Sequence, residues 1–223
     1  MGIFSEEYIS FFKELRENNT REWFKANKKR FEQNVKKPFH DFVDEFIIRV
    51  GEVEPELGIT SKESVFRIYK DTRFSKDKTP HKLHMGAVVA PGGRKNKMEP
   101  GFYFQFSDED VQIHGGGYML ETASLRNLRY YIASDVQAFR DVLNRDSFKD
   151  TYGEINGEKN KKLPKELMEA AAKEPLLYNK QFYFSAYHKP ELILDENLSD
   201  IMFAHYLAGK EFIDYLKEAI KER

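Results

Sequence analysis

The side chains best suited to binding or transforming a ligand lie close together between residues 67 and 81. This segment reads Arg67-Ile-Tyr69-Lys70-Asp71-Thr-Arg73-Phe74-Ser-Lys-Asp77-Lys78-Thr-Pro-His81. Arg67 and Arg73 carry planar, permanently charged groups that match the geometry of a phosphate or a carboxylate. Asp71 lies between them and is expected to orient a guanidinium group, or to act as a base whose pKa the arginines lower. A lowered pKa suits a permanent anion better than a proton carrier near neutral pH.

This motif is part of a longer basic segment. Residues 62–97 contain ten lysines and arginines but three acidic residues, which gives a local net charge of +7, whereas the whole chain of 223 residues has a formal net charge of −1. The near-neutral total argues against a protein that coats nucleic acid non-specifically. The local excess of positive charge favours an anionic ligand or an acidic partner.

Two stretches of alternating side chains are expected to position these groups. Residues 65–71 predict a strand with Arg67, Tyr69 and Asp71 on one face. Residues 101–107 and 111–114, joined by a turn at residues 108–109, predict a hairpin with an apolar face and a polar face. The polar face would carry Tyr103, Gln105, Gln112 and His114. If the strand faces this side of the hairpin, His114 is the best candidate for proton transfer, because histidine titrates closest to physiological pH.

The remaining elements are mostly helices. Apolar side chains recur at helical spacing through most of the first 50 residues, and again over 125–132, 136–143, 165–173, 199–207 and 211–220. Short strands are predicted over 85–90 and 182–187. Helices that flank a mostly antiparallel sheet define the α+β class. No domain boundary is apparent, so the sequence predicts a single domain of residues 1–223, with N-terminal helices, a central sheet and C-terminal helices.

The basic motif also resembles the signature of a known family. The domain-of-unknown-function family numbered 2461 has the pattern Arg-x-x-Arg-Asp-x-Arg-Phe-x-x-x-(Asp or Asn)-Lys-x-x-Tyr, and the chain matches it at Arg67, Asp71, Arg73, Phe74, Asp77 and Lys78. It departs at Lys70 and His81, where the pattern has Arg and Tyr. The aromatic strand at 102–106 and the glycines at 115–117 ahead of a helix also look like that family. The resemblance implies a shared fold and a candidate site but no reaction, because the family has no established activity.

Other interpretations of the same residues stay open. The arginine, aspartate and lysine side chains could form an internal salt-bridge network that pins a loop to the sheet, with no ligand at all. His81 and His84, completed by Asp77 or His114, would suit a metal ion only if residues 81–84 were helical. The neighbouring proline and the apolar run that follows argue against a helix there, and no His-Glu-x-x-His pattern is present.

The glycines Gly115-Gly116-Gly117 lack the spacing of known phosphate-binding loops. They more simply predict a tight turn with positive φ and close packing, although their N–H groups could still contact an anion held by the arginines. The basic stretch 91–97 is expected to be an exposed loop. With the motif it could bind nucleic-acid phosphates while Tyr69 or Tyr103 stacks on bases, but no recognised nucleic-acid motif is present.

The sequence therefore predicts a small anionic ligand, a phosphate or a carboxylate, bound on the polar face of the sheet. The expected binding residues are Arg67, Tyr69, Arg73, Asp77, Lys78, Tyr103 and Gln105, and the expected acid/base or orienting residues in any turnover are His114 and Asp71. The alternative is a non-catalytic module that docks residues 62–97 on nucleic acid or on an acidic protein. Whether the protein is an enzyme, which cofactor it uses and how it assembles stay open, and no metal site is predicted.

Composition narrows the class of protein further. The 223 residues contain no cysteine, which excludes disulfides, thiolate catalysis and cysteine-based metal sites. No apolar run approaches the length of a membrane-spanning helix, and the first residues lack the features of a signal peptide. We therefore expect a soluble, cytoplasmic, globular protein with no membrane partner.

Overall fold

The chain folds into two compact units in the computed structural model, which describes residues 2–73 and 75–221. The first unit comprises the described residues up to Lys95 together with Tyr103–Ile113 and Tyr187–Phe203. The second comprises Asn96–Phe102, His114–Ala186 and the described residues from Ala204 onward. The division into two units does not test the prediction that residues 1–223 form a single domain.

A four-stranded antiparallel sheet with strand order β1-β2-β3-β4 confirms the predicted α+β class. The strands are β1 (His84–Val89), β2 (Gly101–Ser107), β3 (Val111–Gly117) and β4 (Phe182–His188). β1 lies in the first unit, whereas β2, β3 and β4 each contribute residues to both units.

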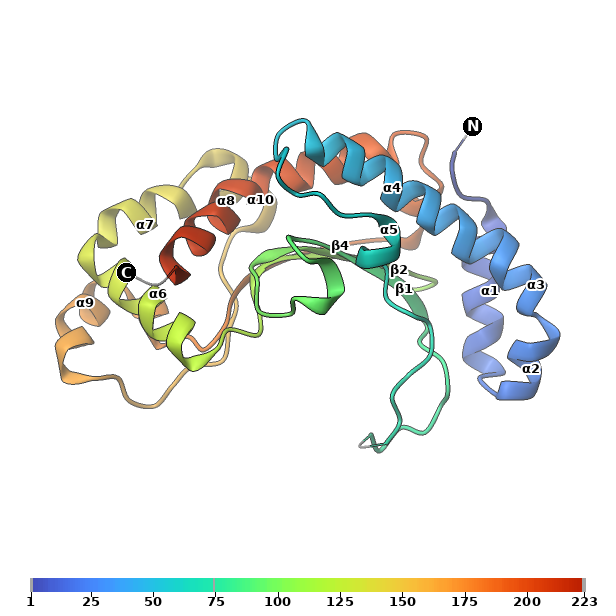
Figure 1. The fold of residues 1–223 in the computed structure, drawn as a ribbon, viewed down its shortest axis with the longest axis horizontal. Helices are drawn as coiled ribbons and strands as arrows, with labels where there is room; N and C mark the ends of the chain where they lie inside the picture. Colours follow the sequence, from blue (N-terminus) through green and yellow to red (C-terminus); the bar gives the residue numbers. More distant parts are fainter. Residues whose placement is uncertain (1, 74, 222–223) are drawn as a thin grey trace. The chain divides into compact units, whose positions relative to one another are not determined.

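Buried aromatic side chains of α1 (Glu6–Glu17) and α4 (Lys37–Gly51) build much of the core of the first unit (Figure 1). The other helical elements of this unit are α2 (Arg21–Ala26), α3 (Lys28–Phe31), the π-helical η1 (Glu32–Lys36), the short α5 (Ser61–Ser64), and the 3-10 turns η2 (Gly93–Lys95) and η5 (Pro190–Leu194). The predicted aromatic stripe of α4 packs on β2, with Phe42 and Phe106 ring centroids 5.4 Å apart. Both rings are fully buried, so this contact anchors one face of β2.

The start of α2 differs from the sequence-based prediction by one residue. The sequence predicts Asn19 as the N-terminal cap, but Thr20 occupies that position, and its side chain accepts a hydrogen bond from the Trp23 backbone N–H. The Asn19 side chain is used elsewhere, because its amide donates to the backbone carbonyl of His81 at 3.0 Å. A long-range contact therefore competes with local capping and takes this side chain.

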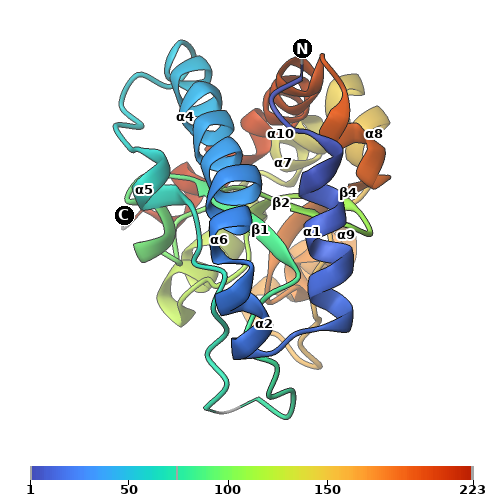
Figure 2. The ribbon, with the colours of Figure 1, turned by 90° about the vertical axis from the view of Figure 1, so that its right-hand side faces the viewer.

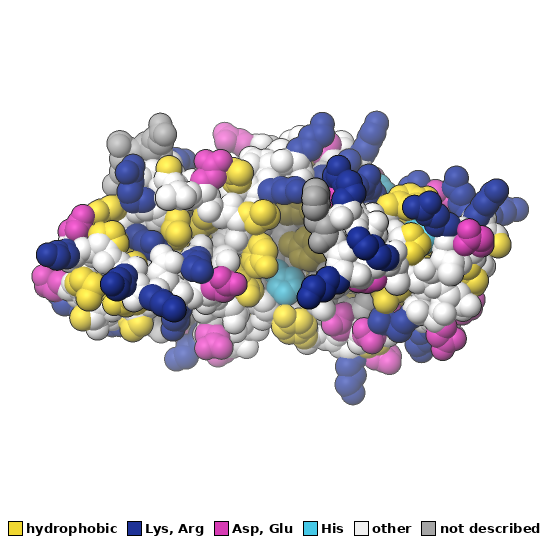
Figure 3. Space-filling model, turned by 90° about the horizontal axis from the view of Figure 1, so that it is seen from below, with side chains coloured by type: hydrophobic (Ala, Val, Ile, Leu, Met, Phe, Trp, Pro, Cys, Tyr) yellow, Lys and Arg dark blue, Asp and Glu magenta, His cyan; other side chains and the backbone are white. Residues whose placement is uncertain are grey.

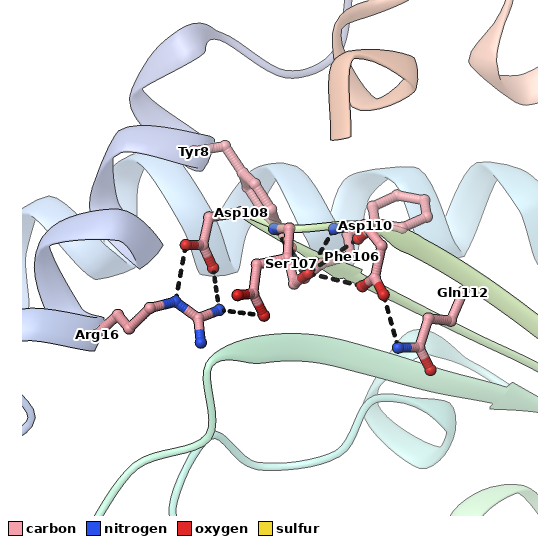
Figure 4. Close-up of polar contacts among 8 residues, drawn as sticks. Tyr8, Arg16, Phe106, Ser107, Asp108, Asp110 and Gln112 are labelled. Atoms are coloured by element: carbon pink, nitrogen blue, oxygen red, sulfur yellow. Dashed lines mark hydrogen bonds and ion pairs between the residues drawn. The ribbon is translucent and has the colours of Figure 1, made fainter. Parts of the chain in front are cut away.

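The predicted turn at residues 108–109 is confirmed, and Figure 4 shows how side chains hold it. The Ser107 N–H donates to the Asp110 carbonyl at 3.0 Å, which sets Phe106 opposite Val111 as the alternation predicts. Arg16 of α1 binds the Asp108 carboxylate with two hydrogen bonds, of 2.8 and 3.0 Å. Because the Asp108 side chain is 5% exposed, this ion pair fastens the turn to α1.

Residues 65–73 and 75–82 form an arm that leads from α5 to β1 and extends away from α4 (Figures 1 and 2). The predicted strand at 65–71 is wrong as a continuous element, because isolated bridges join Val65 to Ala87 and Tyr69 to His81. Between these two bridges the outgoing branch of the arm advances four residues, from Val65 to Tyr69, whereas the returning branch advances six, from His81 to Ala87. The two extra residues interrupt the ladder, as a bulge does.

The second unit contains the helices α6 (Thr122–Ser134), α7 (Val136–Leu143), α8 (Asp146–Tyr152) and α9 (Met168–Lys173), with the 3-10 turns η3 (Lys165–Leu167) and η4 (Pro175–Tyr178). The final helix α10 (Leu198–Ile220) is continuous, so the predicted break at Gly209 is wrong. A Cβ atom at Gly209 would lie 2.8 Å from Cε1 of Phe184, and one at Gly115 would lie 2.7 Å from Cε2 of the same ring. These two glycines leave room for a buried aromatic ring. Packing therefore explains a glycine that local propensity interprets as a helix end.

The glycine run at 115–117 belongs to the end of β3 rather than to a turn before a helix. Gly116 has a φ of +116°, as the prediction of positive φ requires. A Cβ atom on Gly116 would also lie 3.0 Å from Cα of Tyr183 in β4. Close strand packing therefore accounts for these glycines, and we assign them no phosphate-binding role.

Candidate functional site

The predicted motif residues at the tip of the arm are already paired with one another. Arg73 and Asp71 form a two-pronged ion pair, with hydrogen bonds of 2.9 and 2.7 Å. Hydrogen bonds from Arg73 lower the pKa of the Asp71 carboxyl to about 2, so this group is an anion near neutral pH and a poor proton acceptor. The side chains are 76% and 46% exposed, which makes this a surface pair. Phe74 of the motif lies outside the described residues.

A second pair stabilises the same tip. Lys70 Nζ lies 2.6 Å from Asp77 Oδ2 and also donates to Thr79 Oγ1 at 2.7 Å. The hydrogen bond from Lys70, followed by those from Thr79, lowers the pKa of Asp77. Lys78 Nζ donates to the backbone carbonyl of Thr72 at 2.8 Å. The salt-bridge interpretation thus describes the tip, although these pairs are exposed rather than buried.

The base of the arm is fixed to α2. His81 is buried, its ring stacks on Phe24 with centroids 4.0 Å apart, and its backbone N–H donates to Asn19 Oδ1 at 3.2 Å. Tyr69, which is 49% exposed, packs against the edge of the Phe24 ring. His81 therefore has a structural role in the first unit, and burial lowers the pKa of its imidazole.

Tyr103 and Gln105 lie on the polar face of β2, as the alternation predicts. The Tyr103 hydroxyl donates to Gln105 Oε1 at 2.9 Å. The tyrosine ring passes over Gly86 of β1, where a Cβ atom would lie 2.6 Å from the hydroxyl oxygen. Phe66 of the arm contacts the same ring, with centroids 6.0 Å apart. Glycine at position 86 thus allows the hydroxyl to lie above the strand.

Lys82 and Arg67 differ from the cations of the tip because they form no ion pair within the described part of the chain. Lys82 is half-buried, and its Nζ lies 5.2 Å from the centroid of the Phe66 ring. Burial lowers the pKa of Lys82, and the positive charge of Arg67 lowers it further. Two cations therefore act on each other beside the polar face of the first unit, and we find no carboxylate among the described residues that neutralises either one by an ion pair.

His84, the first residue of β1, lies within the influence of the same charges. Burial, helped by the charges of Lys82 and Lys70, lowers the pKa of its imidazole to about 4, against an opposing effect of Asp110. Asp110 is itself bound, because its carboxylate accepts hydrogen bonds of 2.8 Å from Gln112 and from Ser107 (Figure 4). His84 is therefore a neutral imidazole at pH 7, able to donate or accept one hydrogen bond.

The sequence-based interpretation assigned no ligand-binding role to Lys82 or His84. Both belong to the segment His81-Lys-Leu-His84, whose histidines the sequence does not predict to bind a metal. No group of three histidine, aspartate or glutamate side chains that could hold a metal ion occurs among the described residues. The missing information was the half-buried position of Lys82, because a lysine in a basic segment ordinarily extends into water.

His114, the predicted acid or base, belongs to the second unit. Its Nδ1 atom lies 2.8 Å from the Ser185 hydroxyl oxygen of β4. The second unit also contains a cavity of about 570 Å³, lined among others by Lys149, Lys159 and the ion-paired Arg140 and Glu174. None of the predicted site residues lines this cavity.

The surface view in Figure 3, from the side toward which the arm extends in Figure 1, shows lysine and arginine side chains gathered over part of this face. No helix among the described residues is long and apolar enough to span a bilayer. The described residues therefore define an α+β protein whose first unit carries a basic arm.

Comparison with models of known families finds one that matches most of the chain. The model of the family described as "Conserved hypothetical protein (DUF2461)" matches residues 7–215, and the chain belongs to this family. A search of curated proteins finds no match. The predicted family resemblance is thus confirmed, and it carries no assigned reaction.

Proposed function

We propose that the first unit binds a small anionic ligand, a phosphate or a carboxylate, at the base of the arm. The binding groups are Arg67 and Lys82, with Tyr103, Gln105 and His84 beside them. The observation that carries this proposal is the pair of neighbouring cations without a carboxylate partner, one of them half-buried. This site keeps Arg67, Tyr103 and Gln105 of the predicted one and adds Lys82 and His84 in place of the residues at the tip of the arm.

We place the site at Arg67 and Lys82 because neither forms an ion pair with a described residue. An anion that binds Arg73 or Lys70 must compete with Asp71 or Asp77, which already occupy those cations at 2.6–2.9 Å. Arg67 acts on the Asp71 carboxylate through its charge but forms no ion pair with it, and Lys82 forms none with a described residue. An anion beside Arg67 and Lys82 relieves the repulsion between the two positive charges. Because Lys82 is half-buried, water screens this attraction less than it would at the tip.

The neighbouring groups suit the recognition of oxygen atoms. Arg67 offers a planar fork for a phosphate or carboxylate, and Lys82 offers a compact charge. The neutral imidazole of His84 can donate one hydrogen bond to a ligand oxygen, and the Tyr103 hydroxyl, which donates to Gln105, can accept one from a protonated ligand oxygen. Turnover stays a separate prediction: Asp71, with its pKa of about 2, fits an orienting role, and His114 stays the predicted acid or base.

Thermal unfolding in the presence of inorganic phosphate, followed by carboxylates, sugar phosphates and nucleotides, tests the proposal. A ligand at 100 times its Kd adds about 2.7 kcal/mol of stability, which raises the Tm of a chain of this length by roughly 5–11 °C. Arg67→Ala and Lys82→Met are expected to abolish the shift. Lys76→Met, which removes one exposed positive charge from the same segment, is the matched control. A wild-type protein that no small anion stabilises would contradict the proposal.

Docking on nucleic acid or an acidic protein is the second candidate, because the tip of the arm is exposed and the segment 62–97 is basic. Salt dependence separates the two candidates. Binding to a phosphate backbone weakens by orders of magnitude between 50 and 200 mM salt, whereas binding at a half-buried charge weakens much less. The Lys76→Met control should weaken docking but leave the small-ligand site intact.

A cytoplasmic location is also part of this proposal. The 223 residues contain no cysteine, so nothing in the chain depends on an oxidising compartment.

A further inference from the structure

The surroundings of Lys82 suit an amine nucleophile as well as a counter-charge. Its Nζ lies over the face of the Phe66 ring, its side chain is half-buried, and it forms no ion pair with a described residue. The Lys82 backbone N–H donates to the carbonyl of Ile68 at 2.7 Å, which places Lys82 next to the residue that follows Arg67, and the charge of Arg67 acts on the amine. Partial removal from water and a neighbouring cation both favour the neutral amine, and these conditions activate lysine toward carbonyl groups.

Other lysines of the basic segment lack this environment. Lys70 Nζ is held by Asp77 at 2.6 Å and by Thr79 at 2.7 Å, so its amine is occupied by hydrogen bonds. Lys78 Nζ donates to a backbone carbonyl at 2.8 Å. Lys76 is exposed and so keeps full access to water. Lys82 therefore differs from its neighbours in burial and in partners, and not only in its position along the chain.

We propose that Lys82 forms an imine with a small aldehyde or ketone that carries an anionic group, while Arg67 binds that group. The inference rests on the proposed function, since it uses the same site, and it names the class of substrate as an anionic carbonyl compound. The Phe66 ring limits access of water to one side of Lys82 Nζ.

The proposed step balances without an oxidant or a reductant. The Lys82 ammonium first releases a proton to solvent, and the nitrogen lone pair then attacks the carbonyl carbon, forming a C–N bond. The nitrogen then loses one N–H proton and the carbonyl oxygen takes up one proton, which gives a neutral carbinolamine with one N–H and one hydroxyl. A further proton on the hydroxyl and cleavage of the C–O bond release this oxygen as water and leave a protonated imine, and loss of its N–H proton gives the neutral imine.

Reductive trapping tests the inference. The full-length protein is incubated at pH 7 with glyoxylate and cyanoborohydride for a short time, and each modified lysine is located by peptide mass spectrometry. We expect Lys82 to be modified at least tenfold faster than Lys76. A rate at Lys82 equal to that at Lys76 would overturn the proposal.

A neutral aldehyde tests the requirement for an anionic group. With acetaldehyde in place of glyoxylate, the preference for Lys82 over Lys76 should fall several-fold, and Arg67→Met should reduce glyoxylate trapping more than acetaldehyde trapping. Equal preference for the two aldehydes would refute the role given to Arg67.

Comparison of the trapping experiment with the thermal shift that inorganic phosphate produces in the wild type separates the imine from anion binding. If phosphate stabilises the wild type and trapping shows no preference for Lys82, the imine proposal fails and the binding site stands. If phosphate does not change the Tm of the wild type, the proposed anion-binding function is refuted, whatever the trapping experiment shows for Lys82.

Discussion

Gly209→Ala in α10 should destabilise the protein, although alanine is the better helix former. Alanine inside a helix ordinarily gains about 1 kcal/mol over glycine. The new methyl group at position 209 would lie less than 3.0 Å from two atoms of the Phe184 ring, which is fully buried and has Gly115 on another side. The ring therefore has little room to yield.

The expected magnitude follows from these opposing effects. Overpacking of a well-filled core costs typically about 1–3 kcal/mol. We expect the upper part of that range, because Phe184 also packs on Phe148 and Tyr152, with centroids 5.5 and 4.0 Å away. After the gain in helix propensity is subtracted, the net loss in free energy of unfolding is about 1–2 kcal/mol, or a Tm lower by roughly 2–8 °C.

Urea unfolding followed by far-ultraviolet circular dichroism measures this loss. The matched control is Gly51→Ala at the end of α4, where a Cβ atom would meet nothing within 4 Å. That substitution should raise stability by about 0.5–1 kcal/mol. In a second comparison, Phe184→Leu should make the Gly209→Ala substitution less costly. Equal stabilisation by both alanines would refute the packing explanation for the glycine in α10.

Three further predictions concern the first unit. Gly86→Ala should push the Tyr103 hydroxyl from its position 2.6 Å from the new methyl group, so the thermal shift with phosphate should shrink while urea unfolding changes little. The folded-state pKa of His84, about 4, lies below its unfolded value of about 6.5, so its contribution to stability is present above pH 6.5 and is lost as the pH falls toward 4. His84→Gln should therefore flatten the dependence of stability on pH in that window, and an unchanged slope would contradict the assigned pKa. Arg16→Met leaves the buried Asp108 carboxylate without its main partner and should cost about 2 kcal/mol in urea unfolding, a loss that an exposed pair would not show.

Features that depend on local pattern could be predicted from the sequence. The alternation of Phe102, Phe104 and Phe106 identifies the buried face of β2, and the acidic pair at 108–109 identifies the turn. These predictions succeed because the side-chain period of a strand and the length of a hairpin loop are both local properties. The predicted helix break at Gly209 was wrong because the glycine makes room for the ring of Phe184, and Phe184 lies 25 positions earlier in the chain.

Irregular pairing between distant residues also explains why the sequence does not predict Lys82 as a binding residue. Strict alternation through residues 65–71 places the binding groups on an ordinary strand, but the bridges Val65–Ala87 and Tyr69–His81 enclose two more residues on the returning branch than on the outgoing one. A residue gained on one branch changes which side chains face each other across the pair. Lys82 follows directly after the outer bridge, so its side-chain direction depends on this irregularity and no periodic pattern shows it. At the tip the pairing is local instead, because Asp71 and Asp77 lie two and seven positions from the cations that they bind. The most conspicuous charges in the sequence are therefore the ones already neutralised, whereas the proposed binding cations, Arg67 and Lys82, form no ion pair with a described residue.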